Sequence, residues 1–132
     1  MIRICVLTLS LFVAVPLSLG CGRSDSRRLQ SITINQTANG GQVQFTASGT
    51  FSAPPITVAP LAVSWGMGLF APPPPGNLRY ALTTQPYVFD CPDSGPAAVP
   101  VSVLAPSDPY APMSGSLPFK EMITAYAQVQ CP

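Results

Sequence analysis

Cysteines and acidic residues are the side chains whose types and spacing most readily suggest a site in this chain. Its 132 residues contain four cysteines, five acids and no histidine. The cysteines are Cys5, Cys21, Cys91 and Cys131, and the acids are Asp25, Asp90, Asp93, Asp108 and Glu121. Thiols can form a disulfide, carry a lipid or hold a metal, whereas acids without a partner base are poorly equipped for catalysis. The sequence therefore predicts no catalytic residue, no cofactor and no enzyme activity.

The first twenty residues have the layout of a secretory signal. Arg3 supplies a positive charge, 4–15 is an almost uninterrupted apolar run, and Pro16 ends it. The run is shorter than the roughly 20 residues of a membrane span, and the small residue Gly20 suits a signal peptidase. We predict that residues 1–20 direct export and are then removed.

Cys21 follows this segment directly. The stretch Leu17-Ser18-Leu19-Gly20-Cys21 resembles the lipobox of bacterial lipoproteins, in which the cysteine thiol receives a diacylglyceryl group. Gly20 fits that pattern, whereas Ser18 stands where leucine is usual. The resemblance implies lipidation of Cys21 and a membrane as partner, at the outer membrane, the periplasmic face or the cell surface. Ordinary cleavage after Gly20 would instead produce a secreted protein.

The number of cysteines favours lipidation. Loss of Cys5 with the signal leaves three, and an exported protein with an odd cysteine needs an explanation for the unpaired one. Free thiols are unusual outside the cytosol, and two cysteines without histidine make a poor zinc site. We therefore predict a structural disulfide between Cys91 and Cys131, which leaves Cys21 for the lipid.

Residues 21–28 are predicted to form a polar tether between Cys21 and the body of the chain. They carry three arginines and one aspartate, a net charge of +2, whereas 29–132 carry two basic and four acidic residues, a net charge of −2. Basic residues beside anionic headgroups favour the membrane by about 1 kcal/mol each, although a merely soluble linker fits the charges equally well. Neither part is basic enough to suggest nucleic acid.

Residues 29–132 show the alternation of apolar and polar side chains that is typical of half-buried strands. Val43, Phe45 and Ala47 alternate with polar residues, and Asn39-Gly40 before them favours a hairpin turn. Other alternating runs predict strands over 29–34, 61–65, 78–82, 86–89, 99–103 and 122–131. Seventeen prolines argue against long helices. We predict an all-β fold in the form of a small antiparallel β-sandwich.

The first half of this body resembles a known family. Leu29 to Trp65 is similar to the opening half of bacterial immunoglobulin-like domains of the group 2 kind, on the residues Ile32-Thr33-Ile34, Gly41 to Phe51 and Val63-Ser64-Trp65. The resemblance implies an immunoglobulin-like sandwich of exported and surface proteins, used as a spacer or adhesion module without catalytic residues. The second half departs from the family, because 67–77 replaces a short strand and a Gly-rich turn.

Prolines predict where loops and sheet edges lie. Pro100 predicts an edge strand over 99–103, because proline cannot donate to a ladder. The stretch 105–118, rich in Pro, Ser and Gly, predicts a long loop. Pro72 to Pro75 predict an extended polyproline II segment, which is either a docking ligand for an aromatic groove or a rigid loop.

Two further groups of residues are candidate binding sites. Asp90 and Asp93 in 90–95 could hold a calcium ion, but a plain turn is the favoured interpretation, since calcium takes roughly six to eight oxygens. Phe45 and Trp65 occupy the inward phase of strands and are assigned to the core. The tyrosines Tyr110, in a loop, and Tyr126, on the outward phase of the last strand, could stack on sugars or protein, although scattered exposed aromatics are common.

These observations favour a non-enzymatic, exported and lipid-anchored immunoglobulin-like module with a structural or interaction role. The alternative is a carbohydrate- or protein-binding adhesin-type domain that uses its Pro-rich loops. No motif identifies the glycan or protein ligand of either.

Overall fold

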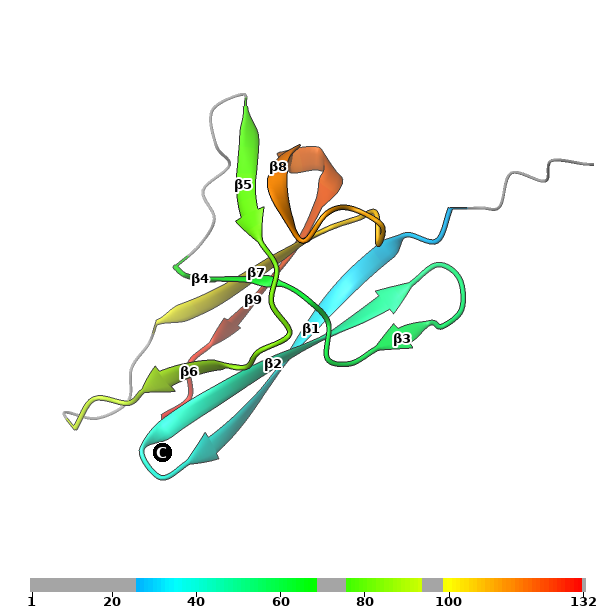
Figure 1. Ribbon diagram of the computed structural model, residues 1–132. Coiled ribbons are helices and arrows are strands. Elements are labelled where there is room, and N and C mark those ends of the chain that lie inside the picture. The colour runs from blue at the N-terminus through cyan, green and yellow to red at the C-terminus, as the bar shows by residue number, and fades with distance from the viewer. Residues whose placement is uncertain (1–25, 69–75, 94–98, 132) are drawn as a thin grey trace, which may run out of the picture.

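The computed structural model describes residues 26–68, 76–93 and 99–131 as antiparallel strands joined by turns and loops (Figure 1). Within these ranges the strands are β1 (Leu29–Asn39), β2 (Gln42–Phe51), β3 (Thr57–Val58), β4 (Ser64–Met67), β5 (Asn77–Ala81), β6 (Tyr87–Asp90), β7 (Pro100–Pro106), β8 (Ser114–Pro118) and β9 (Met122–Gln128), with one 3-10 turn, η1 (Phe119–Glu121). The predicted all-β, antiparallel, sandwich-like fold is confirmed. Among the residues described, no helix is long and apolar enough to cross a bilayer.

The first sheet is built on the hairpin of β1 and β2. Strand β2 also pairs with β3 near its end and with β6 near its beginning. Its alternation is the one expected from the sequence: Val43, Phe45 and Ala47 are buried, while Gln42 and Gln44 are exposed. Apolar burial on one face only is what fixes the register of such a strand, because a slip of one residue would expose all three apolar side chains.

The hairpin turn lies one residue later than the sequence predicts. Asn39 pairs with Gln42, so the turn consists of Gly40 and Gly41, with φ angles of 55° and 88°. A type I′ turn of a two-residue hairpin requires positive φ at both central positions, and glycine adopts such angles without a steric cost. The turn therefore forms at Gly40-Gly41 and not at Asn39-Gly40.

The second sheet has the order β4-β7-β9, with β7 at its centre. The predicted edge strand at Pro100 is therefore wrong. Pro100 is the first residue of β7, a position that tolerates the missing N–H, and its carbonyl accepts from the N–H of Gly68 at 2.8 Å. Residues 101–106 are all buried, which shows that both faces of this strand are covered.

The covering element on the outer face is a ribbon of β5 and β8. Tyr80 of this ribbon packs with Leu104 of β7 and Met122 of β9 in a separate apolar cluster. The long loop predicted over 105–118 is thus only partly correct, since β7 extends to Pro106 and β8 occupies Ser114–Pro118. Tyr80 lies over Gly115, where an added Cβ would come within 3.2 Å of the tyrosine hydroxyl oxygen.

The main core lies between the two sheets. One cluster contains Leu29, Ile32, Ala47, Phe51, Leu61, Val63, Val103 and Ala105, and its neighbour contains Val43, Phe45, Val101 and Val129. Leu61 and Val63 point inward as the sequence predicts, although the strand begins only at Ser64. Leu61 instead donates its N–H to the carbonyl of Ala47 at 2.8 Å.

Candidate functional site

The two ends of the sandwich differ in character, and the β1–β2 register defines them. Leu29 pairs with Phe51 at one end, where the chain enters the fold from the predicted tether, and Asn39 pairs with Gln42 at the other. We call the first the tether end and the second the disulfide end (Figure 1). Each is described in turn.

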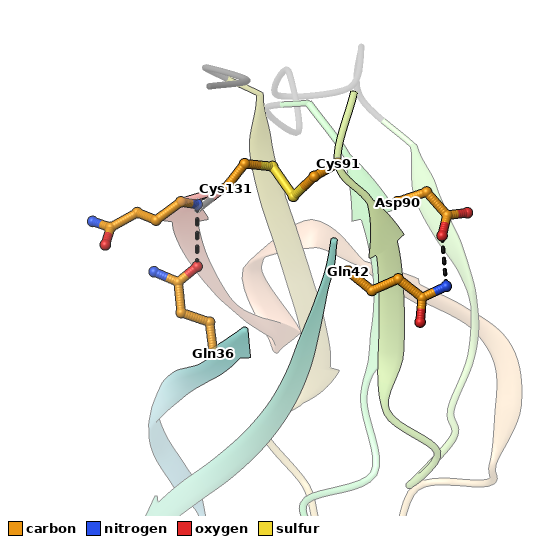
Figure 2. The surroundings of a disulfide bond; sticks show 6 residues. Gln36, Gln42, Asp90, Cys91 and Cys131 are labelled. Atoms are coloured by element: carbon orange, nitrogen blue, oxygen red, sulfur yellow. Dashed lines mark hydrogen bonds between the residues drawn. A yellow bond between two sulfur atoms is a disulfide. The ribbon is translucent and has the colours of Figure 1, made fainter. Parts of the chain in front are cut away.

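The disulfide end carries the predicted bond between Cys91 and Cys131. The sulfurs are 2.03 Å apart and the Cα atoms 5.7 Å apart (Figure 2). Cys91 follows β6 of the first sheet, and Cys131 follows β9 of the second. The bond therefore joins the two sheets covalently, and both half-cystines pack against the core cluster that contains Val43 and Phe45.

Polar contacts hold the hairpin tip against this bond. The N–H of Cys91 donates to the carbonyl of Gly41 at 2.9 Å, and the Gln42 side-chain amide donates to Asp90 Oδ1 at 2.7 Å. A longer bond of 3.4 Å runs from the N–H of Gln130 to Gln36 Oε1 (Figure 2). The first two contacts join the hairpin tip to the end of β6, and the third joins β1 to the segment after β9 of the second sheet.

The acidic pair at this end does not assemble a metal site among the residues described. Asp90 is engaged by the Gln42 amide, and Asp93 is exposed. No group of three or more His, Cys, Asp or Glu side chains gathers within 26–68, 76–93 or 99–131. Ser94 and Gly95, the other members of the candidate turn, lie outside the described residues, as do Pro72 to Pro75 and Cys21.

Aromatic side chains behind the disulfide end belong to the core. Trp65 stacks on Tyr87 with ring centroids 5.9 Å apart, and Phe45 lies 6.4 Å from each of them. Phe45 is fully buried and Trp65 half-buried, as their inward phase predicts. The Trp65 indole nitrogen is buried and has no hydrogen-bond partner among the described residues. This group therefore packs mainly in the interior, with Trp65 and Tyr87 partly exposed.

At the tether end, Arg27 fastens the start of the domain to the loop after β2. Its Nε donates to the carbonyl of Ala53 at 3.1 Å and its Nη2 to that of Pro55 at 2.7 Å. Its guanidinium carbon lies 3.7 Å from the centroid of the Phe51 ring, a cation–π geometry. Three contacts from one side chain give the guanidinium a defined place at the rim of this end.

The loop 107–113 forms the other side of the tether end. The N–H of Leu29 donates to the carbonyl of Ser107 at 2.8 Å, and the Asp108 carboxylate accepts from the N–H of Tyr110 at 2.9 Å. Arg28 Nη1 lies 4.0 Å from Asp108 Oδ2, with both side chains half exposed. Such an exposed pair is worth little by itself, so the backbone bonds are what position the loop.

An apolar groove of about 280 Å³ lies at the tether end, beside the 107–113 loop. Side chains from four strands and three loops line it, among them Leu29, Phe51, Leu61, Leu82, Pro106 and Met113, with Arg27 and Asp108 at the rim. The sequence did not reveal this groove, because no single segment contributes more than a few of its residues. Its mainly apolar lining predicts an affinity for apolar groups, and its few polar side chains include Thr84 and Asp108.

Two tyrosines are exposed, as the sequence predicts. Tyr110 is 85% exposed in the 107–113 loop, and Tyr126 is 43% exposed on the outer face of β9. Tyr80, in β5, is buried between the β5–β8 ribbon and the second sheet, and Tyr87 is half-buried in the aromatic group. The exposed tyrosines come from different elements, and Tyr110 belongs to the tether end.

Comparisons with known proteins add no family or relative to these geometric observations. None of the family models, curated proteins or solved structures compared with the chain matches it.

Proposed function

We propose that this chain is an exported, lipid-anchored, immunoglobulin-like module without enzymatic activity, which serves a structural or interaction role at a membrane surface. The observation that carries the proposal is the placement of the tether and the disulfide at opposite ends of the β1–β2 hairpin. A domain anchored through Cys21 would then turn its disulfide end away from the bilayer. The end stabilised by the disulfide would then face the surroundings and be available for contact with a partner.

The disulfide supports export. Bonds of this kind persist in oxidising compartments, and small exported domains use them to supplement a limited core. The bond closes a loop with a sequence separation of 40 residues, for which the chain-entropy estimate is about 4 kcal/mol. That is comparable to the net stability of about 5–15 kcal/mol expected of a small domain. The fold is therefore suited to an environment in which the bond can form.

The absence of a reactive constellation among the described residues supports a non-enzymatic role. The groove at the tether end is lined mainly by apolar side chains, and Asp108 at its rim lies near Arg28 and accepts from the N–H of Tyr110. Catalysis at such a place would need a nucleophile or a base within reach of a substrate. Binding is the chemistry that this surface supports best.

Cell fractionation of a bacterial producer tests the anchor. Full-length protein should be recovered in the membrane fraction and should carry label after growth with a radioactive fatty acid. The variant Cys21→Ser should be unlabelled. Unlabelled full-length protein recovered from the medium would refute the proposal.

A further inference from the structure

We infer that the tether end rests on the bilayer to which the proposed anchor is attached, through an interfacial surface made of Ile56, Tyr110 and Met113. The inference depends on the proposed lipid anchor and adds an orientation to it. Its occupant is the boundary between headgroups and acyl chains of that bilayer.

Three large apolar side chains are exposed at this end. Ile56 is 47%, Tyr110 85% and Met113 56% exposed, and they make up half of the six large apolar side chains that are exposed among the described residues. Apolar side chains that gather on one part of a surface are typical of a contact with a membrane or another protein, whereas singly scattered ones need no explanation.

Contacts with the residues around Arg27 and Arg28 place all three near the point where the chain enters the domain. Ile56 follows Pro55, whose carbonyl Arg27 holds. Tyr110 donates its N–H to Asp108, which faces Arg28, and Met113 lines the apolar groove together with Arg27. The interfacial surface therefore surrounds the residues that lead to the tether.

The length of the tether decides which end can reach the lipid. Five residue steps separate Cys21 from Ser26, a span of at most about 18 Å when fully extended. The eleven residues of β1 extend about 33 Å from the tether end to the disulfide end. An acylated Cys21 would therefore hold the tether end within reach of the headgroups, with the disulfide end beyond it.

The side chains suit that position chemically. Tyrosine is enriched at membrane interfaces because its ring is apolar and its hydroxyl is polar, and arginine can leave its stem in apolar surroundings with its charge among headgroups. Arg27 and Arg28 are opposed by Asp108 and Glu121 at the same end. Lys120 beside Glu121 adds a third cation at this end, so anionic headgroups should also favour the contact and added salt should weaken that part of it.

Quenching of tryptophan fluorescence by brominated lipid tests the contact. Acylated mature protein is reconstituted in phosphatidylethanolamine–phosphatidylglycerol vesicles containing brominated phosphatidylcholine. The variants Tyr110→Trp and Ile56→Trp should be quenched at least threefold more than the wild type, whose single tryptophan is Trp65 with a buried indole nitrogen. The matched control is Val88→Trp, because Val88 is 48% exposed and lies about 26 Å along the strands from the tether end.

The outcomes separate this inference from the anchor. Flotation of the wild type with the vesicles reports the anchor, and near-ultraviolet circular dichroism confirms that each variant is folded. Flotation with stronger quenching at positions 56 and 110 than at 88 supports the inference. Flotation with equal quenching at all three positions overturns it and leaves the anchor in place. Failure of the acylated protein to float overturns both.

Discussion

Gly49 is the residue at which the core between the sheets comes closest to the backbone of β2. A Cβ built there would lie 2.8 Å from Leu29 Cδ1 and 2.9 Å from Leu61 Cδ2. Real Cβ atoms do not approach carbon so closely, so a larger residue forces both leucines to move. The alternation of β2 predicts that position 49 faces the core. That only glycine fits there without a shift of its neighbours depends partly on Leu61, which follows twelve residues later and outside any strand.

We therefore predict that Gly49→Ala destabilises the fold by about 1–3 kcal/mol through overpacking. Urea unfolding measured by circular dichroism gives the difference in free energy. The control Ser48→Ala lies on the outward phase of the same strand and should change stability by less than about 0.5 kcal/mol. Equal stability of wild type and Gly49→Ala would show that the two leucines relax freely.

Tyr80 presents the opposite case, a polar atom in an apolar place. Its hydroxyl is buried and has no hydrogen-bond partner among the described residues. A buried hydroxyl without a partner costs about 1–3 kcal/mol in desolvation. Tyr80→Phe should therefore leave thermal stability unchanged or raise it, whereas Tyr110→Phe, at an 85% exposed ring, should have no effect. A clear loss of stability in Tyr80→Phe alone would reveal a hydrogen bond to that hydroxyl.

At the scale of elements, the sequence is informative where one face of a strand is apolar. Strand β2 satisfies that condition, and its predicted inward residues are the buried ones. Strand β8 does not, because Ser114-Gly115-Ser116-Leu117-Pro118 has a single large apolar residue and reads as a loop. It is a strand because β5 supplies Tyr80 to cover Gly115, a contact that only the tertiary structure creates.

Strand β7 is a second element whose place in the sheet the sequence did not predict. Its prolines Pro100 and Pro106 stand at its two ends, where a ladder bond is not required, so the strand can be central despite them. The ribbon then buries Leu104 on the outer face, which a sandwich of two sheets would have exposed. The groove at the tether end was equally invisible, because its lining comes together from several segments.

The ribbon should be separable from the sheets in its effect on stability. Leu117 packs against the cluster of Tyr80, Leu104 and Met122, whereas the core between the sheets does not depend on it. We predict that Leu117→Ala destabilises by less than about 2 kcal/mol, and that Val103→Ala, at a fully buried position, costs more. Hydrogen exchange should rise in β5 and β8 of Leu117→Ala while β2 stays protected. Uniform loss of protection would mean that the ribbon and the sheets unfold as one unit.

At the scale of the whole molecule, the disulfide and the tether mark two opposite ends of the domain. The disulfide joins the two sheets at one end (Figure 2), and the chain enters at the other (Figure 1). The first of these features was predictable from cysteine parity and the second from the layout of the first 28 residues. Their position at opposite ends was not, because it depends on which way the β1–β2 hairpin runs relative to β6 and β9.

Loss of the disulfide should weaken the whole fold without removing it. The double variant Cys91→Ser/Cys131→Ser should be less stable by about 4 kcal/mol, the loop-closure estimate for this separation. Chemical unfolding under oxidising conditions gives the value, and the same experiment with reductant should bring the wild type to the level of the variant. A difference below about 1 kcal/mol would indicate that the core alone holds the two sheets together.

The state of the cysteines in the mature protein tests the central claim most directly. Mass spectrometry of unreduced peptides from membrane-extracted protein should find Cys91 joined to Cys131 and an acyl mass on Cys21 at the new N-terminus. Cys21 in a disulfide with either partner, or present as an unmodified thiol, would contradict the account of an anchored and braced module.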